Sequence, residues 1–366
     1  MSQDSALIEP LTFPVSQKTI KNRIALAPMT NLQSHSDGSL SKDEHNWLKM
    51  RIEGDFGMII TAAAFVQNDG RAWNGQIGLH NEHSADSFAT LCREAEVNRS
   101  LTLAQLFHGG LRATAQKLNP SPSGGTNSKG ETIGYAMQIH EIKECIAAFV
   151  ESAKRAQRVG FSGVEIHGAH GYLVHQFLSK QTNTRNDEWG GNFTNRARFL
   201  LEIVRGIRIA CGEDFLLGVR LSPEDSQWFH GIEFSEALDL AAQLAEDEKV
   251  DYLHISLWDA FKAPDHQPEG IAAITQMRNY VPANTPLITA GKIWSSKDAQ
   301  NVMELGADIV ALGRVAIAHP NWAKEAINSS FNPSTPPFGV AELSKAGLSE
   351  VFINYMKRWP NFVQES

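Results

Sequence analysis

The sequence predicts a single (β/α)8 barrel, a TIM barrel, with an N-terminal cap and a C-terminal tail. Eight short apolar segments recur along the 366 residues, each is followed by a stretch of helical periodicity, and no proline- or serine-rich linker divides the chain. Repeated strand–helix units close into such barrels, which run from about 200 to over 400 residues. We therefore expect one domain over residues 1–366, with the barrel core at about 21–330 and a C-terminal segment at 331–366.

The expected strands are almost continuously apolar, which is typical of parallel strands buried on both faces. A doubly wound sheet is the alternative, but its first strand would lead into a glycine-rich phosphate-binding turn. The residues APMTN stand there instead, which favours the barrel. In order, the expected strands are Ile24–Met29, Phe56–Phe65, Leu101–Phe107, Phe161–His167, Phe215–Leu221, Tyr252–Leu257, Pro286–Ala290 and Ala307–Gly313.

The segments between these strands have apolar residues at helical spacing. One segment differs: residues 118–134, LNPSPSGGTNSKGETIG, are rich in proline, glycine and serine and predict a long loop before the third helix. Such a loop often acts as a lid, and a solvated loop without that role is the alternative. The expected helices are Asp43–Glu53, Ala85–Arg99, Glu141–Val159, Asn195–Ala210, Ser235–Glu248, Gly270–Tyr280, Ser296–Leu305 and Trp322–Asn328.

Composition argues against several classes of protein. A net charge of -8 does not fit a nucleic-acid-binding surface, which needs a basic excess. Cys92, Cys145 and Cys211 lack the spacing of a disulfide framework or a metal site. The first residues show no signal-peptide pattern, and no apolar run reaches the length of a membrane span. We expect a soluble cytoplasmic protein with no metal, nucleic-acid or membrane partner.

Polar side chains gather at the expected C-terminal ends of the strands, where TIM barrels build their active sites. Gln105 stands on the third strand, Arg220 near the end of the fifth, and His167 at the end of the fourth, followed by His170 and Tyr172. An amide, a guanidinium, two imidazoles and a phenol suit a planar polar molecule and an anion better than they suit hydrolysis.

The last two strands end in pairs of a glycine and a cation, Gly291-Lys292 and Gly313-Arg314. Barrels commonly bind phosphate between the loops after strands seven and eight. Glycine lets an oxygen approach the backbone, and lysine or arginine supplies charge. The two pairs therefore predict a phosphate site.

Five ordered motifs resemble the Old Yellow Enzyme family of FMN-dependent ene-reductases. The longest is Gly160–Leu201, GFSGVEIHGAHGYLVHQFLSKQTNTRNDEWGGNFTNRARFLL. Lys21–Thr30 resembles the family's first strand, and QLFHG, VRLSP and DIVALGR match at 105–109, 219–223 and 308–314. The similarity covers roughly residues 7 to 325, and the late segment NYMKRWPNFV resembles the family's closing segment.

The resemblance implies FMN as cofactor, with NADH or NADPH as reductant. His167 and His170 match the pair that binds the activating oxygen of the substrate, and Tyr172 matches the proton donor. Trp258 would border the substrate pocket or pack under a loop. The residues implied to hold FMN are Pro28, Met29, Thr30, Ala63 and Gln105 at the ring, Arg220 near N1 and O2, and Gly291, Lys292, Gly313 and Arg314 at the phosphate.

The implied reaction is reduction of an activated C=C bond in an α,β-unsaturated carbonyl or nitro compound. Flavin N5 would deliver hydride, two imidazoles would stabilise the developing negative charge, and a phenol would protonate the other carbon. The alternatives are an oxidative demethylase or amine dehydrogenase on the same barrel, and a flavin-binding module without significant turnover.

Three positions depart from the family's pattern. Thr30 replaces the cysteine of some relatives, Ala62 replaces a frequent acidic residue, and Lys292 replaces a common glycine. The sequence leaves open the physiological substrate, the choice between NADH and NADPH, and whether the chain forms a homo-oligomer. It also leaves open whether Arg358 reaches a neighbouring active site, as a tail arginine does in some relatives.

Overall fold

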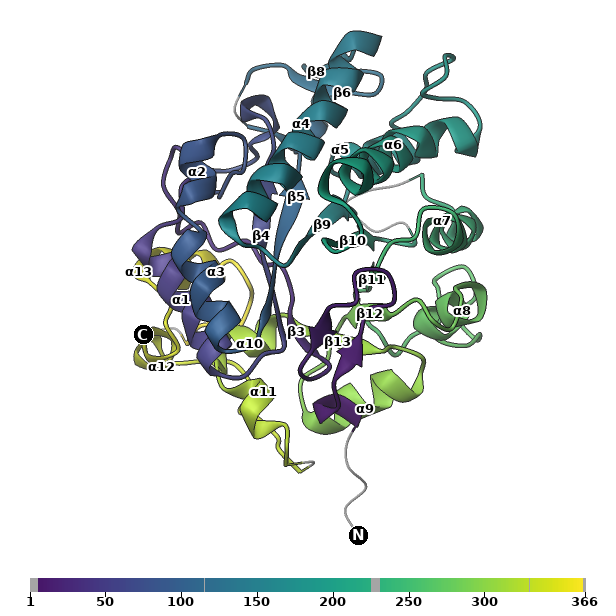
Figure 1. Cartoon of the computed structure of the whole chain (residues 1–366). Helices are drawn as coiled ribbons and strands as arrows, with labels where there is room; N and C mark the ends of the chain where they lie inside the picture. The colour runs from purple at the N-terminus through teal and green to yellow at the C-terminus, as the bar shows by residue number, and fades with distance from the viewer. Residues whose placement is uncertain (1–5, 115, 225–230, 329, 365–366) are drawn as a thin grey trace.

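A closed barrel of eight parallel strands forms the centre of the computed structural model, which describes residues 6–114, 116–224, 231–328 and 330–364 (Figure 1). This confirms the predicted TIM barrel. Around the barrel the strands are β3 (Ile24–Leu26), β4 (Met58–Phe65), β5 (Leu101–Phe107), β9 (Gly163–Gly168), β10 (Leu216–Leu221), β11 (Tyr252–Ser256), β12 (Leu287–Ala290) and β13 (Ile309–Leu312).

The expected strands lie at the expected places, although several are shorter. β3 ends at Leu26 rather than at Met29. The N–H of Ala27 still donates to the carbonyl of Leu312, but Pro28 has no N–H with which to extend the ladder. Pro28, Met29 and Thr30 are therefore released from the sheet at the mouth of the barrel.

Helices surround the barrel as predicted, with one correction. The helix expected over Ala85–Arg99 is two helices, because the hydroxyl of Ser87 between them donates to the carbonyl of Ser84 and accepts from the N–H of Leu40. The ring contains α1 (Lys42–Glu53), α2 (Glu82–Asp86), α3 (Ala89–Val97), α4 (Ile139–Val159), α6 (Phe193–Cys211), α7 (Phe234–Glu246), α8 (Ala273–Tyr280), α9 (Ser296–Glu304) and α11 (Trp322–Glu325).

Two further short helices at the strand ends were not predicted. α5 (Leu173–Leu178) follows β9, and α10 (Arg314–Ala318) follows β13. Each begins directly after a predicted site residue: Tyr172 precedes α5, and Gly313 precedes α10.

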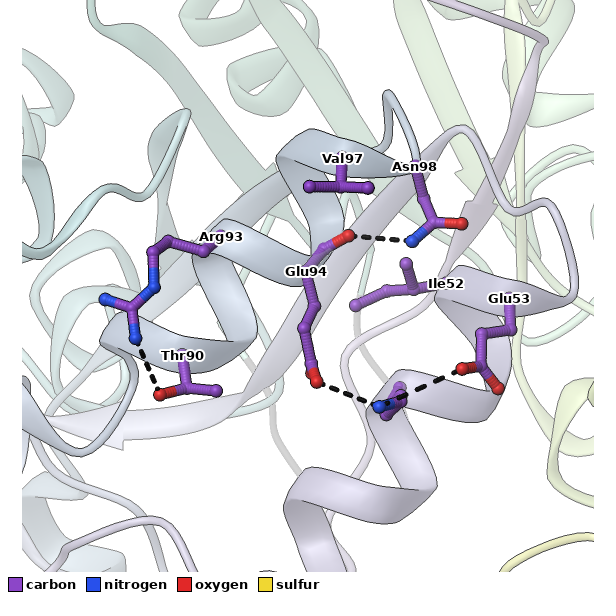
Figure 2. A pocket seen from close by; sticks show the side chains of 8 residues that line it. Ile52, Glu53, Thr90, Arg93, Glu94, Val97 and Asn98 are labelled. Atoms are coloured by element: carbon purple, nitrogen blue, oxygen red, sulfur yellow. Dashed lines mark hydrogen bonds and ion pairs between the residues drawn. The ribbon is translucent and has the colours of Figure 1, made fainter.

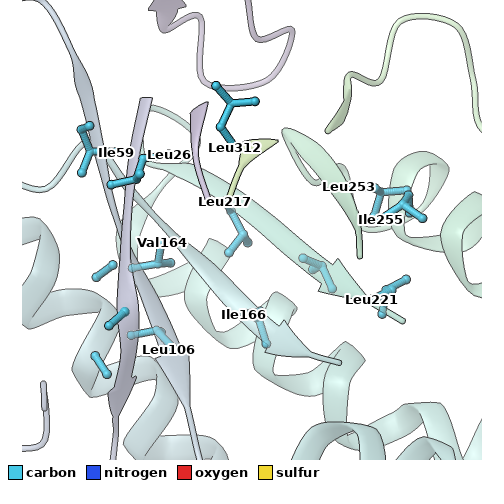
Figure 3. Packing of buried hydrophobic residues seen from close by; sticks show 14 of the residues in the cluster. Leu26, Ile59, Leu106, Val164, Ile166, Leu217, Leu221, Leu253, Ile255 and Leu312 are labelled. Atoms are coloured by element: carbon cyan, nitrogen blue, oxygen red, sulfur yellow. The ribbon is translucent and has the colours of Figure 1, made fainter. Parts of the chain in front are cut away.

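The apolar core has two layers. Outward-facing strand residues such as Leu106, Ile166 and Leu253 belong to the layer between the strands and the helices (Figure 3). The second layer fills the barrel interior, where the N-terminal cap contributes Phe13 and Ile20 from the hairpin of β1 (Leu11–Thr12) and β2 (Thr19–Ile20). The cap therefore supplies core side chains to the interior of the barrel.

The segment 118–134 is not the structureless loop that its composition predicts. It forms most of a small sheet of β6 (Asn119–Ser121), β7 (Gly125–Thr126) and β8 (Thr132–Ala136). Gly124 and Gly130 adopt positive φ at its turns, which glycine does without steric cost. Strands of two to five residues are too short to show a readable alternation in sequence.

The expected C-terminal tail is folded against the barrel. It contains α12 (Val340–Lys345) and α13 (Glu350–Met356), which lie beside α1 (Figure 1). The rings of Phe352 on α13 and Trp47 on α1 are 5.5 Å apart. Of the helices in the described ranges, none is both long and apolar enough to cross a membrane.

Candidate active site

A cavity of about 340 Å³ opens at the C-terminal ends of the strands. Many of the predicted site residues line it, and they come from six different strand ends and the loops that follow them. They are Pro28, Met29, Thr30, His170, Arg220, Trp258, Gly291, Lys292, Gly313 and Arg314.

The end of the cavity formed by the last two strands has exposed backbone and positive charge. Gly291 has a φ of 146°, and a Cβ there would lie 2.7 Å from the carbonyl oxygen of Leu257, so the turn requires glycine. A Cβ on Gly313 would meet nothing closer than the Met29 sulfur at 3.8 Å, so a ligand has room to approach this backbone. With Arg314 beside it, this end of the cavity suits an anionic group.

Lys292 occupies the left-handed region, with a φ of 53°. This explains why glycine is common at the position, because a lysine side chain is strained there. The ammonium group forms an ion pair with Asp259 at 3.0 Å. Lys292 therefore lines the cavity while its charge is already engaged by a carboxylate.

A layer of buried polar groups lies inside the barrel, around Glu165. Its carboxylate accepts from Gln105 Nε2 at 2.7 Å, from His254 Nδ1 at 2.8 Å and from the Tyr252 hydroxyl at 3.1 Å. Glu165, on β9, is thus the fully buried centre of this layer. Gly218 makes room for this layer, because a Cβ there would lie 2.0 Å from the ring of Tyr252.

The charge of this layer follows from its donors. Burial alone would raise the pKa of Glu165, but His254, Arg220 and Gln105 hold the pKa below its usual value, so the carboxylate is ionised. Because the amide nitrogen of Gln105 is engaged by Glu165, its carbonyl oxygen is the group left to accept from a ligand.

His167, His170 and Tyr172 form a cluster beside Arg220. The His167 ring centroid lies 5.1 Å from that of His170 and 5.2 Å from that of Tyr172. Arg220 is the register partner of His167 on the neighbouring strand. The fourth and fifth strands therefore bring the predicted imidazoles, phenol and guanidinium together.

Burial sets the protonation states of this cluster. Burial, followed by the charge of Arg220, lowers the pKa of His167 to about 3 and that of His170 well below its ordinary value. Burial raises the pKa of Tyr172, partly offset by the Arg112 guanidinium, which lies 4.6 Å from the centre of the phenol ring. At neutral pH the cluster thus contains two neutral imidazoles and a protonated phenol.

Four predicted residues lie next to the cavity without lining it: Ala63, Gln105, His167 and Tyr172. Ala63 is the register partner of Gln105, and both are almost fully buried.

The cavity also has lining residues that the sequence did not indicate, including Trp294, Tyr355, Met356 and Trp359. The last three lie on or just after α13, and Tyr355 lines the same cavity as Thr30. Arg358 lies over the ring of Tyr355 in the same chain, at 5.4 Å. The closing motif NYMKRWPNFV was the only sequence signal for this wall.

A second pocket, of about 240 Å³, lies outside the barrel between α1 and α3 (Figure 2). Its lysine, Lys49, forms a 2.9 Å ion pair with Glu94 across the pocket. It contains none of the residues at the strand ends, so we assign the chemistry to the first cavity. In the described ranges, no three His, Cys, Asp or Glu side chains are placed to hold a metal ion.

Comparison with known proteins gives consistent matches. The model of the NADH:flavin oxidoreductase / NADH oxidase family matches residues 6–330. The Bacillus subtilis protein named "Probable NADH-dependent flavin oxidoreductase YqiG" is 37% identical over 324 residues, which are 86% of each chain. The NADH:acrylate oxidoreductase of Vibrio harveyi is 33% identical over 88% of this chain, but the match spans only 33% of that longer protein. The structure of an old yellow enzyme homologue from Zymomonas mobilis has the same fold, with a TM-score of 0.80 at 23% identity over 94% of this chain and 99% of that one.

Proposed function

This chain belongs to the NADH:flavin oxidoreductase / NADH oxidase family, and from that premise we propose that it reduces the activated C=C bond of an α,β-unsaturated carbonyl or nitro compound. The membership confirms the resemblance to Old Yellow Enzyme: the chain is an FMN-dependent oxidoreductase that uses NADH or NADPH. The alkene substrate, the roles of the site residues and the proton donor are parts of the proposal.

The residues around the cavity fit FMN. Arg220 is buried, and its Nε has no hydrogen-bond partner among the described residues, so a donor is available for the flavin. Gln105 would accept a hydrogen bond at the pyrimidine edge. Gly291, Gly313 and Arg314 would hold the phosphate. When bound, FMN supplies the hydride chemistry.

His167 and His170 would bind the carbonyl or nitro oxygen of the alkene. Their low pKa values keep both rings neutral, so each carries one N–H. Two such N–H donors stabilise negative charge as it develops on that oxygen. Neither ring has to lose a proton before it can donate this hydrogen bond.

Tyr172 would protonate the carbon next to the activating group. Its raised pKa keeps the phenol protonated before the reaction, and the Arg112 cation over the ring stabilises the phenolate that remains afterwards. The single observation that carries the proposal is this cluster of two neutral imidazoles and a protonated phenol beside Arg220.

The two half-reactions test the proposal separately by stopped-flow absorbance. For Tyr172→Phe we expect unchanged reduction of the enzyme by NADH and roughly 100-fold slower reoxidation by 2-cyclohexenone, since general acid catalysis contributes about 10²–10⁴-fold. Equal loss in both half-reactions would contradict the role of Tyr172. If the enzyme oxidises an N-methyl amine and Tyr172→Phe keeps that activity, the demethylase alternative would be favoured. Negligible turnover with both NADH and NADPH would favour a flavin-binding module.

We also propose a cytoplasmic location and a single functional unit over residues 1–366. The three cysteines are free and buried, which suits a reducing compartment. The likeness to the acrylate oxidoreductase makes small unsaturated acids the first substrates to assay, although this chain spans only a third of that protein. Sedimentation of the purified chain would decide whether it forms a homo-oligomer.

A further inference from the structure

His170 is held in an uncommon conformation. Its φ is 59°, in the left-handed region, where a residue with a Cβ is strained. Its backbone N–H lies 3.3 Å from Ser222 Oγ, and its carbonyl accepts from Arg112. Such strain persists only where the surroundings fix the residue, and here they aim its imidazole.

The ring of His170 meets a residue with no role so far, Ser256 at the end of β11. Ser256 Oγ lies 2.8 Å from His170 Nε2 and 3.0 Å from Arg220 Nη2. A guanidinium has only donors, so the serine oxygen accepts from Arg220. The hydroxyl proton is then directed to His170 Nε2.

The opposite arrangement leaves a group unsatisfied. If His170 Nε2 donated to Ser256, the serine oxygen would accept twice, and its own proton would have no acceptor among the contacts of the described residues. An unsatisfied hydroxyl in this half-buried site is unfavourable. Nε2 is therefore the acceptor, and the proton of the neutral ring lies on Nδ1.

His167 has the other tautomer. Its Nδ1 lies 3.3 Å from the backbone N–H of Ala169, which can only donate, so the ring proton lies on Nε2. The two neutral imidazoles thus carry their protons on different nitrogens, one fixed by the backbone and the other by a side chain.

We propose that Ser256 is a positioning residue that fixes the Nδ1–H tautomer of His170 by linking its ring to Arg220. The tautomer follows from the structure alone; its consequence for substrate binding rests on the proposed function. The same Ser256 hydroxyl contacts Arg220, so it connects Arg220, which we propose lies at the flavin, with His170, which we propose binds the substrate oxygen.

The test is ¹⁵N NMR of the histidine rings in the FMN-loaded enzyme without substrate, with His170→Asn to assign the signals. We expect Nδ1–H for His170 in the wild type, and at least half Nε2–H in Ser256→Ala. Ser222→Ala is the matched control, since among the described residues its hydroxyl hydrogen-bonds only the backbone of His170, and the ring tautomer should not change. Ser256→Thr keeps the hydroxyl and should keep the tautomer even if Ser256→Ala folds poorly.

A second readout is the affinity for a para-substituted phenol, followed by its long-wavelength absorption with FMN. We expect at least tenfold weaker binding in Ser256→Ala and less than twofold change in Ser222→Ala. Nε2–H in the wild type, or an unchanged ring in Ser256→Ala, would overturn the inference. Because the tautomer is measured without turnover, failure to reduce any alkene would refute the proposed function and leave this result standing.

Discussion

Arg51 provides the sharpest test of how the C-terminal helices are attached. The side chain is fully buried on α1, stacks on Trp47 and makes five hydrogen bonds, all to backbone carbonyls. Those carbonyls belong to Trp47 on α1, Ala316 and Ile317 on α10, and Ala346 just after α12. One guanidinium thus joins the helix that begins with Arg314 to the C-terminal segment.

We expect Arg51→Met to lower the free energy of unfolding by about 3–5 kcal/mol, because methionine fills much of the space but removes the side-chain donor from the buried carbonyls of Ala316, Ile317 and Ala346. Urea unfolding measures this. Arg51→Lys keeps at most three donors, so its free energy of unfolding should lie between those of the wild type and Arg51→Met. Since α10 is no longer held, FMN should also dissociate more readily, which the fluorescence of released flavin reports.

Arg93 is an exposed arginine whose side chain bonds only Thr90 in the described structure, and it gives a matched control. Arg93→Met should change the stability by less than about 0.5 kcal/mol, as most surface substitutions do. If Arg51→Met cost no more than Arg93→Met, the carbonyl contacts would not hold the C-terminal segment, and the reasoning would be wrong.

Three further predictions concern single residues. Lys292→Gly should change the free energy of unfolding by less than about 1 kcal/mol, because loss of the ion pair with Asp259 is offset by relief of the strain of a left-handed lysine. A larger loss in urea unfolding would show that the ion pair stabilises the fold more than this. Gly218→Ala should lower the free energy of unfolding by about 2 kcal/mol or more, since the new methyl group overlaps the ring of Tyr252. The double variant Gly218→Ala/Tyr252→Leu should recover part of that loss. Equal stability of the single and double variants would refute the clash. The unfolded His167 ring takes up a proton below pH 6.5, whereas the folded ring does so only near pH 3. The free energy of unfolding should therefore fall as the pH drops through this window, by up to about 1.4 kcal/mol per pH unit. In urea unfolding from pH 5 to 7, His167→Asn should show a weaker dependence of this free energy on pH than the wild type.

The sequence predicted the barrel because eight short, almost continuously apolar segments alternate with stretches of helical periodicity. It also predicted which residues lie at the strand ends, and the structure places Arg220 beside His167 through the register of β9 and β10. Both follow from local pattern and from the geometry of parallel barrels. The function of these residues stays a prediction until the half-reactions are measured.

What the sequence could not indicate depends on contacts between distant segments. Ser256 stands in an unremarkable apolar strand, and only the closed barrel brings its hydroxyl to Arg220 and His170. Tyr355 lies beyond residue 330, where the family model ends, in a segment without strand or barrel periodicity. The small sheet at 118–134 was missed because glycine and proline there form turns between very short strands.

The wall that α13 adds to the cavity has a consequence for the order of synthesis. Ala27, near the start of the barrel, and Trp359, near the end of the chain, line the same cavity. A nascent chain cannot complete this cavity until Trp359 has emerged from the ribosome. Tight capture of a ligand in it is therefore expected only after Trp359 has emerged, and a message truncated after the barrel would yield a protein whose cavity lacks one side.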